Sequence, residues 1–215
     1  MQARPRLPRS PTKGEGIALF GGVFDPVHNG HLAIAEEGLR MLEVPSLTYL
    51  PAGQPPHKVA GPDASPEMRL AMLQLSLAAH PRMNVDDREL RRSGLSYTYL
   101  TLQELHSEHP EEPIYFLLGA DNVGLLKNWV QAEEVLRLCH PVVVPRRGFR
   151  SHFRAEELPF VSAERLAQIN SMALPEAFYP CSSSEIRARV VAGKDISHLV
   201  PSAVASYIQK HGLYR

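Results

Sequence analysis

Two histidines follow a pair of glycines in the stretch GGVFDPVHNGH at residues 21–31. Gly21 and Gly22 predict a tight turn at which the backbone can pass close to a ligand, because glycine has no side chain. His28 and His31 lie three residues apart where we expect a helix to begin. The N–H groups and the dipole of a helix start favour an anion. The stretch therefore predicts a phosphate site to which both imidazoles donate hydrogen bonds.

The two histidines alone leave other interpretations open. The His-x-x-His spacing also fits half of a metal site, or two polar residues on the surface. The next turn carries no acidic ligand, and the sequence has no other cluster of cysteine and histidine. We therefore predict no metal bound directly by the protein.

A second candidate for phosphate binding is the serine-rich stretch SSSEIR at residues 182–187. Ser182 and the glutamate three residues later have the spacing of a capping box, which predicts that a helix begins here. This structural role is compatible with a functional one. The hydroxyls of Ser183 and Ser184, the first N–H groups of the helix, and Arg187 one turn further on would form a second cradle for phosphate.

Alternating apolar patterns indicate the scaffold that positions these motifs. Short apolar runs predict strands over residues 17–20, 47–50, 83–85, 114–118, 142–144 and 177–179. Amphipathic or capped segments predict helices over residues 32–44, 66–79, 97–109, 131–138, 182–191 and 202–211. Strands that alternate with helices favour an α/β fold, and we expect a Rossmann-like, doubly wound parallel sheet with a short helical C-terminal part. In such sheets, ligands bind beyond the carboxyl ends of the strands.

The composition is that of an ordinary folded protein of 215 residues, with 44% hydrophobic and 21% charged residues. Basic and acidic residues number 23 each, so the formal net charge is zero. A net charge of zero argues against general electrostatic binding to nucleic acid or to anionic membranes. The sequence contains no run of 18 apolar residues and no apolar signal-peptide region. We expect a cytoplasmic protein with neither nucleic-acid nor membrane partners, and the pattern leaves open whether it forms a homo-oligomer.

The first residues differ from the rest of the chain. Residues 1–16 carry four basic residues and one acid among prolines and glycines. We expect a flexible basic tail, with an arm for nucleic acid as the less favoured alternative, and one domain over residues 17–215. Cys139 and Cys181 belong to no C-x-x-C pair, which favours two buried free thiols in a reducing compartment.

The GGVFDPVHNGH motif resembles the signature of the nucleotidyltransferase superfamily with the short H-x-G-H element. More narrowly, residues 17–215 are similar to the bacterial nicotinate-nucleotide adenylyltransferases. The other matching segments are PPHK at 55–58, REL at 88–90, SYT at 96–98, GAD at 119–121, Trp129, SSSEIR at 182–187 and the terminal GLYR at 212–215. The SYT segment and the Asp121–Trp129 pair restrict the resemblance to the pyridine-nucleotide branch of this superfamily.

The resemblance implies adenylyl transfer from ATP to nicotinate mononucleotide, which gives nicotinate adenine dinucleotide and pyrophosphate in a step of NAD biosynthesis. It implies that His28, His31 and Arg187 stabilise the reacting phosphates. The implied ATP site consists of Gly21, Gly22, Phe24, His28, His31, Gly119, Asp121, Ser182, Ser183, Ser184 and Arg187. Mg²⁺ would arrive with the triphosphate and be held mainly by phosphates and water.

The nucleotide substrate is implied to contact His57, Lys58, Thr98, Tyr99, Trp129 and Val130. Trp129 would stack on the pyridine ring. Without the resemblance, Trp129 fits core packing, Lys58 fits a solvated loop, and Asp121 fits a helix cap.

Two alternatives to this function stay open at the level of sequence. One is a sister adenylyltransferase with another acceptor, such as phosphopantetheine. The other is a non-catalytic nucleotide-binding sensor on the same fold. Tyr97, Thr98 and Trp129 argue against the first. The presence of every phosphate-contact position argues against the second.

Overall fold

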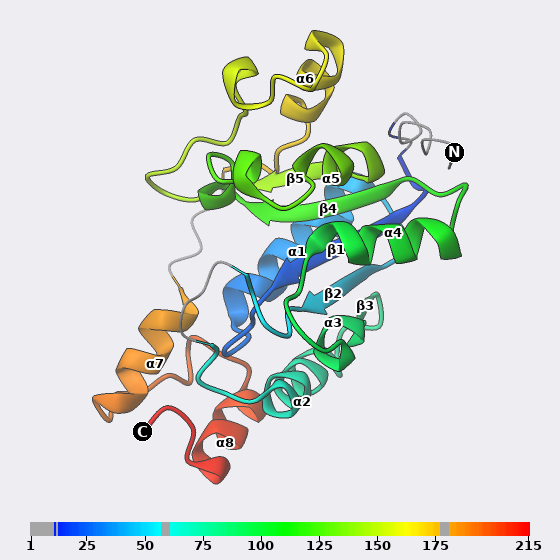
Figure 1. The fold of residues 1–215 in the computed structure, drawn as a ribbon. Coiled ribbons are helices and arrows are strands. Elements are labelled where there is room, and N and C mark those ends of the chain that lie inside the picture. Colours follow the sequence, from blue (N-terminus) through cyan, green and yellow to red (C-terminus); the bar gives the residue numbers. More distant parts are fainter. Residues whose placement is uncertain (1–10, 12, 57–60, 177–180) are drawn as a thin grey trace. The chain divides into compact units, whose positions relative to one another are not determined.

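A five-stranded parallel sheet runs through the computed structural model, which describes residues 11, 13–56, 61–176 and 181–215. The strands stand in the order β3-β2-β1-β4-β5 (Figure 1). Their bounds are β1 (Ile17–Gly22), β2 (Leu47–Pro51), β3 (Met83–Val85), β4 (Ile114–Gly119) and β5 (His140–Val144). This order confirms the expected doubly wound α/β fold. The strand expected over residues 177–179 lies outside the described residues.

Burial explains why the strands are nearly continuous apolar runs. In the register of β1 and β4, Ile17 lies opposite Ile114 and Phe20 opposite Leu117. Every residue of β5 is buried, as is every residue of β4 before Gly119. A parallel strand covered on both faces requires apolar side chains on both sides, which removes the polar alternation of a half-exposed strand.

Helices connect the strands and follow them. Their bounds are α1 (Asn29–Leu42), α2 (Pro66–Leu77), α3 (Arg88–Arg91), α4 (Thr98–Glu108), α5 (Ala132–Leu138), α6 (Ala163–Asn170), α7 (Ser183–Val191) and α8 (Ser202–His211), with short 3-10 helices η1 (Ala120–Asn122), η2 (Leu126–Asn128) and η3 (Ala155–Glu157). All six predicted helices are present, with ends shifted by at most three residues. The helices α3 and α6 and the 3-10 helices were not predicted.

Local signals account for the helices that were predicted. The side chain of Ser65 accepts a hydrogen bond from the N–H of Met68, and Pro66 is the first residue of α2. The apolar stripe expected on α1 is buried, as shown by Leu32, Ala35, Leu39 and Leu42. Capping and amphipathic spacing therefore determine where these helices lie.

The chain divides into two compact units. Of the described residues, the first unit contains those up to 20, 37–47 and 97–176, and the second contains those of 21–36, 48–96 and 181–215. Within the first unit, β4 pairs with β5 and α4 packs against α5. Within the second unit, α2 packs against α8.

Most of the predicted tail, residues 1–16, lies outside the described residues. In its described part, Lys13 forms an ion pair of 2.8 Å with Glu43, and the N–H of Gly14 donates to the carbonyl of Leu42 at 3.1 Å. Both contacts join residues 13–14 to the end of α1.

Both cysteines are free thiols. Cys139 is buried, and burial raises the pKa of its thiol to about 12. Cys181 is only half-buried, which corrects the expectation of two buried thiols. Of the helices in the described ranges, none is long and apolar enough to cross a membrane.

Candidate active site

The turn after β1 is shaped by a buried phenylalanine. Phe24 has a φ of 51° and is 2% exposed. Its ring meets the ring of His31 edge-on at 5.0 Å and that of Tyr49 at 5.3 Å between centroids. A Cβ at Gly22 would lie 2.8 Å from the Phe24 ring. Gly21 and Gly22 are the last residues of β1, so the turn begins after them, and Gly22 leaves room for the phenylalanine.

The two histidines of the motif lie face to face. The rings of His28 and His31 stack with centroids 3.6 Å apart and planes inclined by 23°. The backbone N–H of His28 donates to Nδ1 of His31 at 3.2 Å. Because Nδ1 accepts, the proton of a neutral His31 ring lies on Nε2. Tyr49 fixes this first turn of α1 by donating its hydroxyl to the carbonyl of His31 at 3.0 Å.

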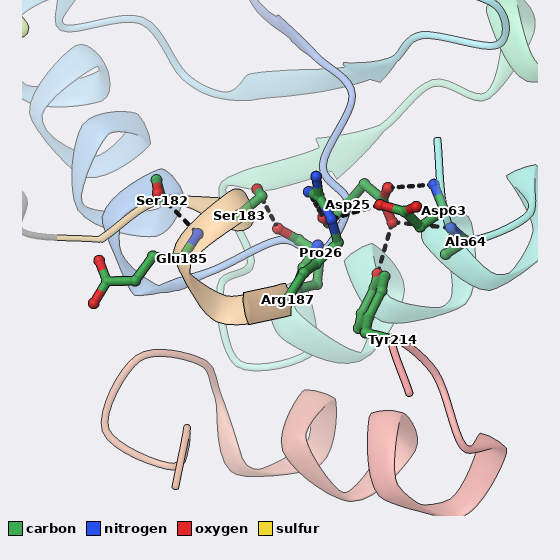
Figure 2. Close-up of polar contacts among 9 residues, drawn as sticks. All are labelled: Asp25, Pro26, Asp63, Ala64, Ser182, Ser183, Glu185, Arg187 and Tyr214. Atoms are coloured by element: carbon green, nitrogen blue, oxygen red, sulfur yellow. Dashed lines mark hydrogen bonds and ion pairs between the residues drawn. The ribbon is translucent and has the colours of Figure 1, made fainter. Parts of the chain in front are cut away.

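A buried carboxylate holds the turn against two other segments of the second unit (Figure 2). Asp25 is 3% exposed. Its carboxylate accepts hydrogen bonds from the N–H of Asp63 at 2.7 Å, the N–H of Ala64 at 3.2 Å and the hydroxyl of Tyr214 at 2.7 Å. Burial, and then the bond to Asp25, raise the pKa of Tyr214, so its hydroxyl is a protonated donor.

The start of α7 is tied to the same turn. The Ser183 hydroxyl donates to the carbonyl of Pro26 at 2.9 Å. Arg187 donates from Nη1 to the carbonyl of Asp25 at 2.8 Å, and its Nε lies 2.6 Å from the carboxylate of Asp63. The serine-rich cradle and the histidine motif, predicted separately, are therefore joined by direct contacts (Figure 2).

The capping box expected at α7 forms in one direction. The Ser182 hydroxyl accepts a hydrogen bond from the N–H of Glu185 at 3.2 Å. The carboxylate of Glu185 pairs with Nε of Arg189 at 3.1 Å, one turn along the helix. Ser184 is exposed. The helix start therefore keeps an exposed hydroxyl beside its first N–H groups.

A buried arginine that the sequence analysis missed joins two loops. Arg69 on α2 is 0% exposed. Its Nη1 donates to the carbonyls of Val23 at 2.8 Å and Ala52 at 2.7 Å, and its Nη2 donates to Gly53 at 3.3 Å. Burial lowers the pKa of Arg69, yet a guanidinium remains charged at neutral pH. The available signal was a lone arginine on the apolar face of α2.

The predicted residues at the ends of β4 and β5 lie in the first unit. Asp121 lies in η1, and a Cβ at Gly119 would lie 2.4 Å from its carboxylate. The same carboxylate pairs with Nη1 of Arg146 at 3.0 Å. Gly119 is thus required by the close approach of the Asp121 side chain, and Arg146 neutralises that side chain.

The predicted substrate residues of the first unit lie at two helix ends. Thr98 and Tyr99 open α4, where the first N–H groups have no acceptor within the helix. Trp129 follows η2 and is half-buried, so full core packing does not describe it. Val130 is 47% exposed.

The structure brings one group of predicted residues together within the second unit. The turn and α7 residues lie in the second unit, where His28, His31, Ser182, Ser183, Ser184 and Arg187 belong to the described contacts or flank them. Thr98, Tyr99, Gly119, Asp121, Trp129 and Val130 lie in the first unit. His57 and Lys58 lie outside the described residues. Within the ranges described, no group of three or more His, Cys, Asp or Glu side chains could hold a metal ion.

Comparison with known proteins defines the class. A family model described as cytidylyltransferase-like matches residues 19–189. The doubly wound chain is therefore a nucleotidyltransferase, and it belongs to the cytidylyltransferase-like family. Two solved structures of nicotinic acid mononucleotide adenylyltransferase from Plasmodium falciparum, with NaAD and with APC, share the fold. They have TM-scores of 0.74 and 0.71 at 19% identity, and each alignment covers 93% of this chain and 97% of theirs.

Relatives of higher sequence identity show which group within this family the chain belongs to. A Synechococcus protein named "Probable nicotinate-nucleotide adenylyltransferase" is 41% identical over 94% of this chain and 98% of its own. Proteins of the same name from Geobacillus thermodenitrificans and Rhodopirellula baltica are 41% and 35% identical, over 92% and 96% of this chain and 85% and 96% of theirs. Within the nucleotidyltransferases, the chain is a member of the nicotinate-nucleotide adenylyltransferases.

We expect Arg69→Met to lower the free energy of unfolding by about 2–4 kcal/mol, because three carbonyls lose the hydrogen bonds of a fully buried donor. Urea denaturation followed by circular dichroism measures this. Arg91→Met is the matched control, since the Arg91 side chain is 71% exposed, and it should change the stability by less than about 0.5 kcal/mol. Equal effects of the two substitutions would show that Arg69 does not hold the loops.

Proposed function

We propose that the chain transfers the adenylyl group of ATP to nicotinate mononucleotide and releases pyrophosphate, as its family membership indicates. The observation that carries the site assignment is the set of contacts joining the His28–His31 turn to the start of α7 through Arg187 and Ser183. These contacts gather two imidazoles, a guanidinium and a helix N-terminus around one turn. Such donors fit a triphosphate.

The reaction needs little covalent chemistry from the protein. A 5′-phosphate oxygen of nicotinate mononucleotide attacks the α-phosphorus of ATP. The bond from that phosphorus to the bridging oxygen of the β-phosphate breaks, and pyrophosphate leaves with the electron pair. The attacking phosphate is already ionised at neutral pH, so no general base is required. Catalysis therefore consists of positioning the reactants and stabilising charge.

Charge stabilisation falls to the second unit in this proposal. His28, His31 and Arg187 donate hydrogen bonds to the phosphates, and the N–H groups at the start of α7 add partial positive charge. Gly21 and Gly22 let the backbone approach the nucleotide. The ring of Phe24 is buried, so Phe24 would contribute through its backbone.

The other predicted residues keep, in this proposal, the roles that the family resemblance implies. Gly119 and Asp121 line the nucleotide site, and Trp129 stacks on the pyridine ring. The N–H groups near Thr98, Tyr99 and Val130 receive the pyridine carboxylate, and His57 and Lys58 bind the substrate phosphate.

Magnesium fits this donor set as a companion of ATP. The phosphate cradle offers N–H groups, hydroxyls, imidazoles and a guanidinium, and the described residues form no carboxylate cluster. Mg²⁺ would therefore take its ligands from phosphate oxygens and water, and its charge would offset that of the triphosphate. We also propose that residues 17–215 act as one domain in the cytoplasm.

We expect His28→Ala and His31→Ala each to lower kcat by about 10²–10³-fold, the usual cost of losing one preorganised donor. Pyrophosphate release under saturating substrates measures the effect, and circular dichroism confirms folding. His109→Ala is the control, because His109 is an exposed histidine paired with Glu112. Near-normal turnover of either variant would remove that histidine from the mechanism.

Arg187→Ala should weaken ATP binding by roughly 10–150-fold and slow turnover, because a charge-assisted hydrogen bond contributes about 1.5–3 kcal/mol. Titration calorimetry with a non-hydrolysable ATP analogue measures the affinity. Arg189→Ala on the same helix is the control, since Arg189 pairs with Glu185. An ATP affinity unchanged by Arg187→Ala contradicts the assignment.

The protein should prefer nicotinate mononucleotide to its amide counterpart by about 10²-fold or more in kcat/KM. Backbone N–H groups suit a carboxylate, whereas a carboxamide sets its own NH₂ against at least one of them. Both nucleotides are assayed at one concentration of ATP and Mg²⁺. Equal values, or a preference for the amide, would overturn the acceptor while leaving adenylyl transfer intact.

A further inference from the structure

The C-terminal residues hold an unusual backbone conformation. After α8 ends at His211, Gly212 has a φ of 62° and Tyr214 a φ of 60°. The left-handed region suits glycine, but it is strained for tyrosine. Leu213 anchors the segment, because it is 9% exposed and its N–H donates to the carbonyl of Ile208 at 3.1 Å. A strained residue persists only where its surroundings determine its position.

A hydrogen bond from the hydroxyl of Tyr214 offsets this backbone strain. It reaches Asp25 at 2.7 Å, although the two residues are 189 positions apart. Figure 2 shows the tyrosine pointing from the C-terminal segment to the Asp25 carboxylate, beside the backbone of residues 63–64. Tyr214 is the only side chain among the three donors to this carboxylate.

Arg187 is held by two groups, which we call its anchors, and both belong to the network around Asp25. One anchor is the carbonyl of Asp25 itself, which accepts from Nη1, and the other is the carboxylate of Asp63 beside Nε. The side chain of Asp25 joins these anchors by accepting the N–H of Asp63. Tyr214 thus completes the network that fixes where the guanidinium lies, although its own hydrogen bond goes to Asp25 and not to Arg187.

We infer that Tyr214 is a positioning residue for adenylyl transfer, which acts through Asp25 to aim Arg187 at the phosphates. This inference rests on the proposed function. When the hydroxyl is lost, the carboxylate can turn, and both anchors of the guanidinium shift with it. A small misplacement of a charged donor affects the transition state more than the fold, since the reaction depends on geometry.

The test is Tyr214→Phe, which removes one oxygen and keeps the ring. We expect kcat to fall about tenfold and the dissociation constant of ATP to rise about fivefold. The KM for nicotinate mononucleotide should stay within about twofold of wild type, because Tyr214 acts on the phosphate cradle alone. Circular dichroism at the assay temperature should show a folded protein.

Tyr207→Phe is the matched control. Tyr207 lies on α8, and its ring stacks on His211 with centroids 4.2 Å apart, so this substitution removes a hydroxyl from the same part of the chain. We expect wild-type kcat and ATP affinity. If Tyr214→Phe matched this control in both measurements, the inference would be overturned.

A double-mutant cycle separates positioning from general support of the fold. In an Arg187→Lys background the effect of Tyr214→Phe on ATP affinity should shrink to less than about twofold, because the guanidinium it positions is absent. An undiminished effect in that background would show that Tyr214 acts independently of Arg187. If the wild-type protein bound ATP but did not use nicotinate mononucleotide, the proposed function would fail, and the ATP affinities would still decide the role of Tyr214.

Discussion

The buried carboxylate of Asp25 constrains the site more than any other group. A charge removed from water is unfavourable unless donors replace the water. Here the donors are the N–H groups of Asp63 and Ala64 and the hydroxyl of Tyr214. Each belongs to a segment distant from Asp25 in sequence. None of these segments can shift alone without leaving a buried carboxylate short of a donor, so the turn that carries the histidines is held before any substrate arrives.

A buried cation holds the same turn through different atoms. Arg69 binds the carbonyl of Val23, two residues before Asp25, and the carbonyls of Ala52 and Gly53 after β2. The opposite charge of Asp25 favours the protonated arginine, against the effect of burial. The turn after β1 and the loop after β2 are therefore set by side chains that the proposed mechanism never brings to the substrate. Some side chains thus hold the loops while others contact the substrate, and this separation of roles suits a reaction that depends on positioning.

The sequence predicted what short-range patterns determine. Caps such as Ser65 and the apolar runs of the strands located the sheet and six helices, because their signals lie within a few residues. The motif residues could be named, but their mutual contacts could not. Arg187 meets Asp63, and Tyr214 meets Asp25, across most of the chain length, and no local periodicity encodes such pairs. Arg69 was missed because an arginine on a helix usually indicates an exposed face. The terminal GLYR segment could be matched to the family from sequence, but the hydrogen bond of Tyr214 to Asp25 is visible only in the fold.

Pyrophosphate release from ATP and Mg²⁺, measured with nicotinate mononucleotide, with phosphopantetheine and with no acceptor, is the most direct test of this account. We expect turnover with nicotinate mononucleotide alone, because the chain belongs to the nicotinate-nucleotide adenylyltransferases. Turnover with phosphopantetheine would assign the cradle to a sister enzyme. ATP binding without turnover on any acceptor would indicate a sensor, and either result would contradict the account.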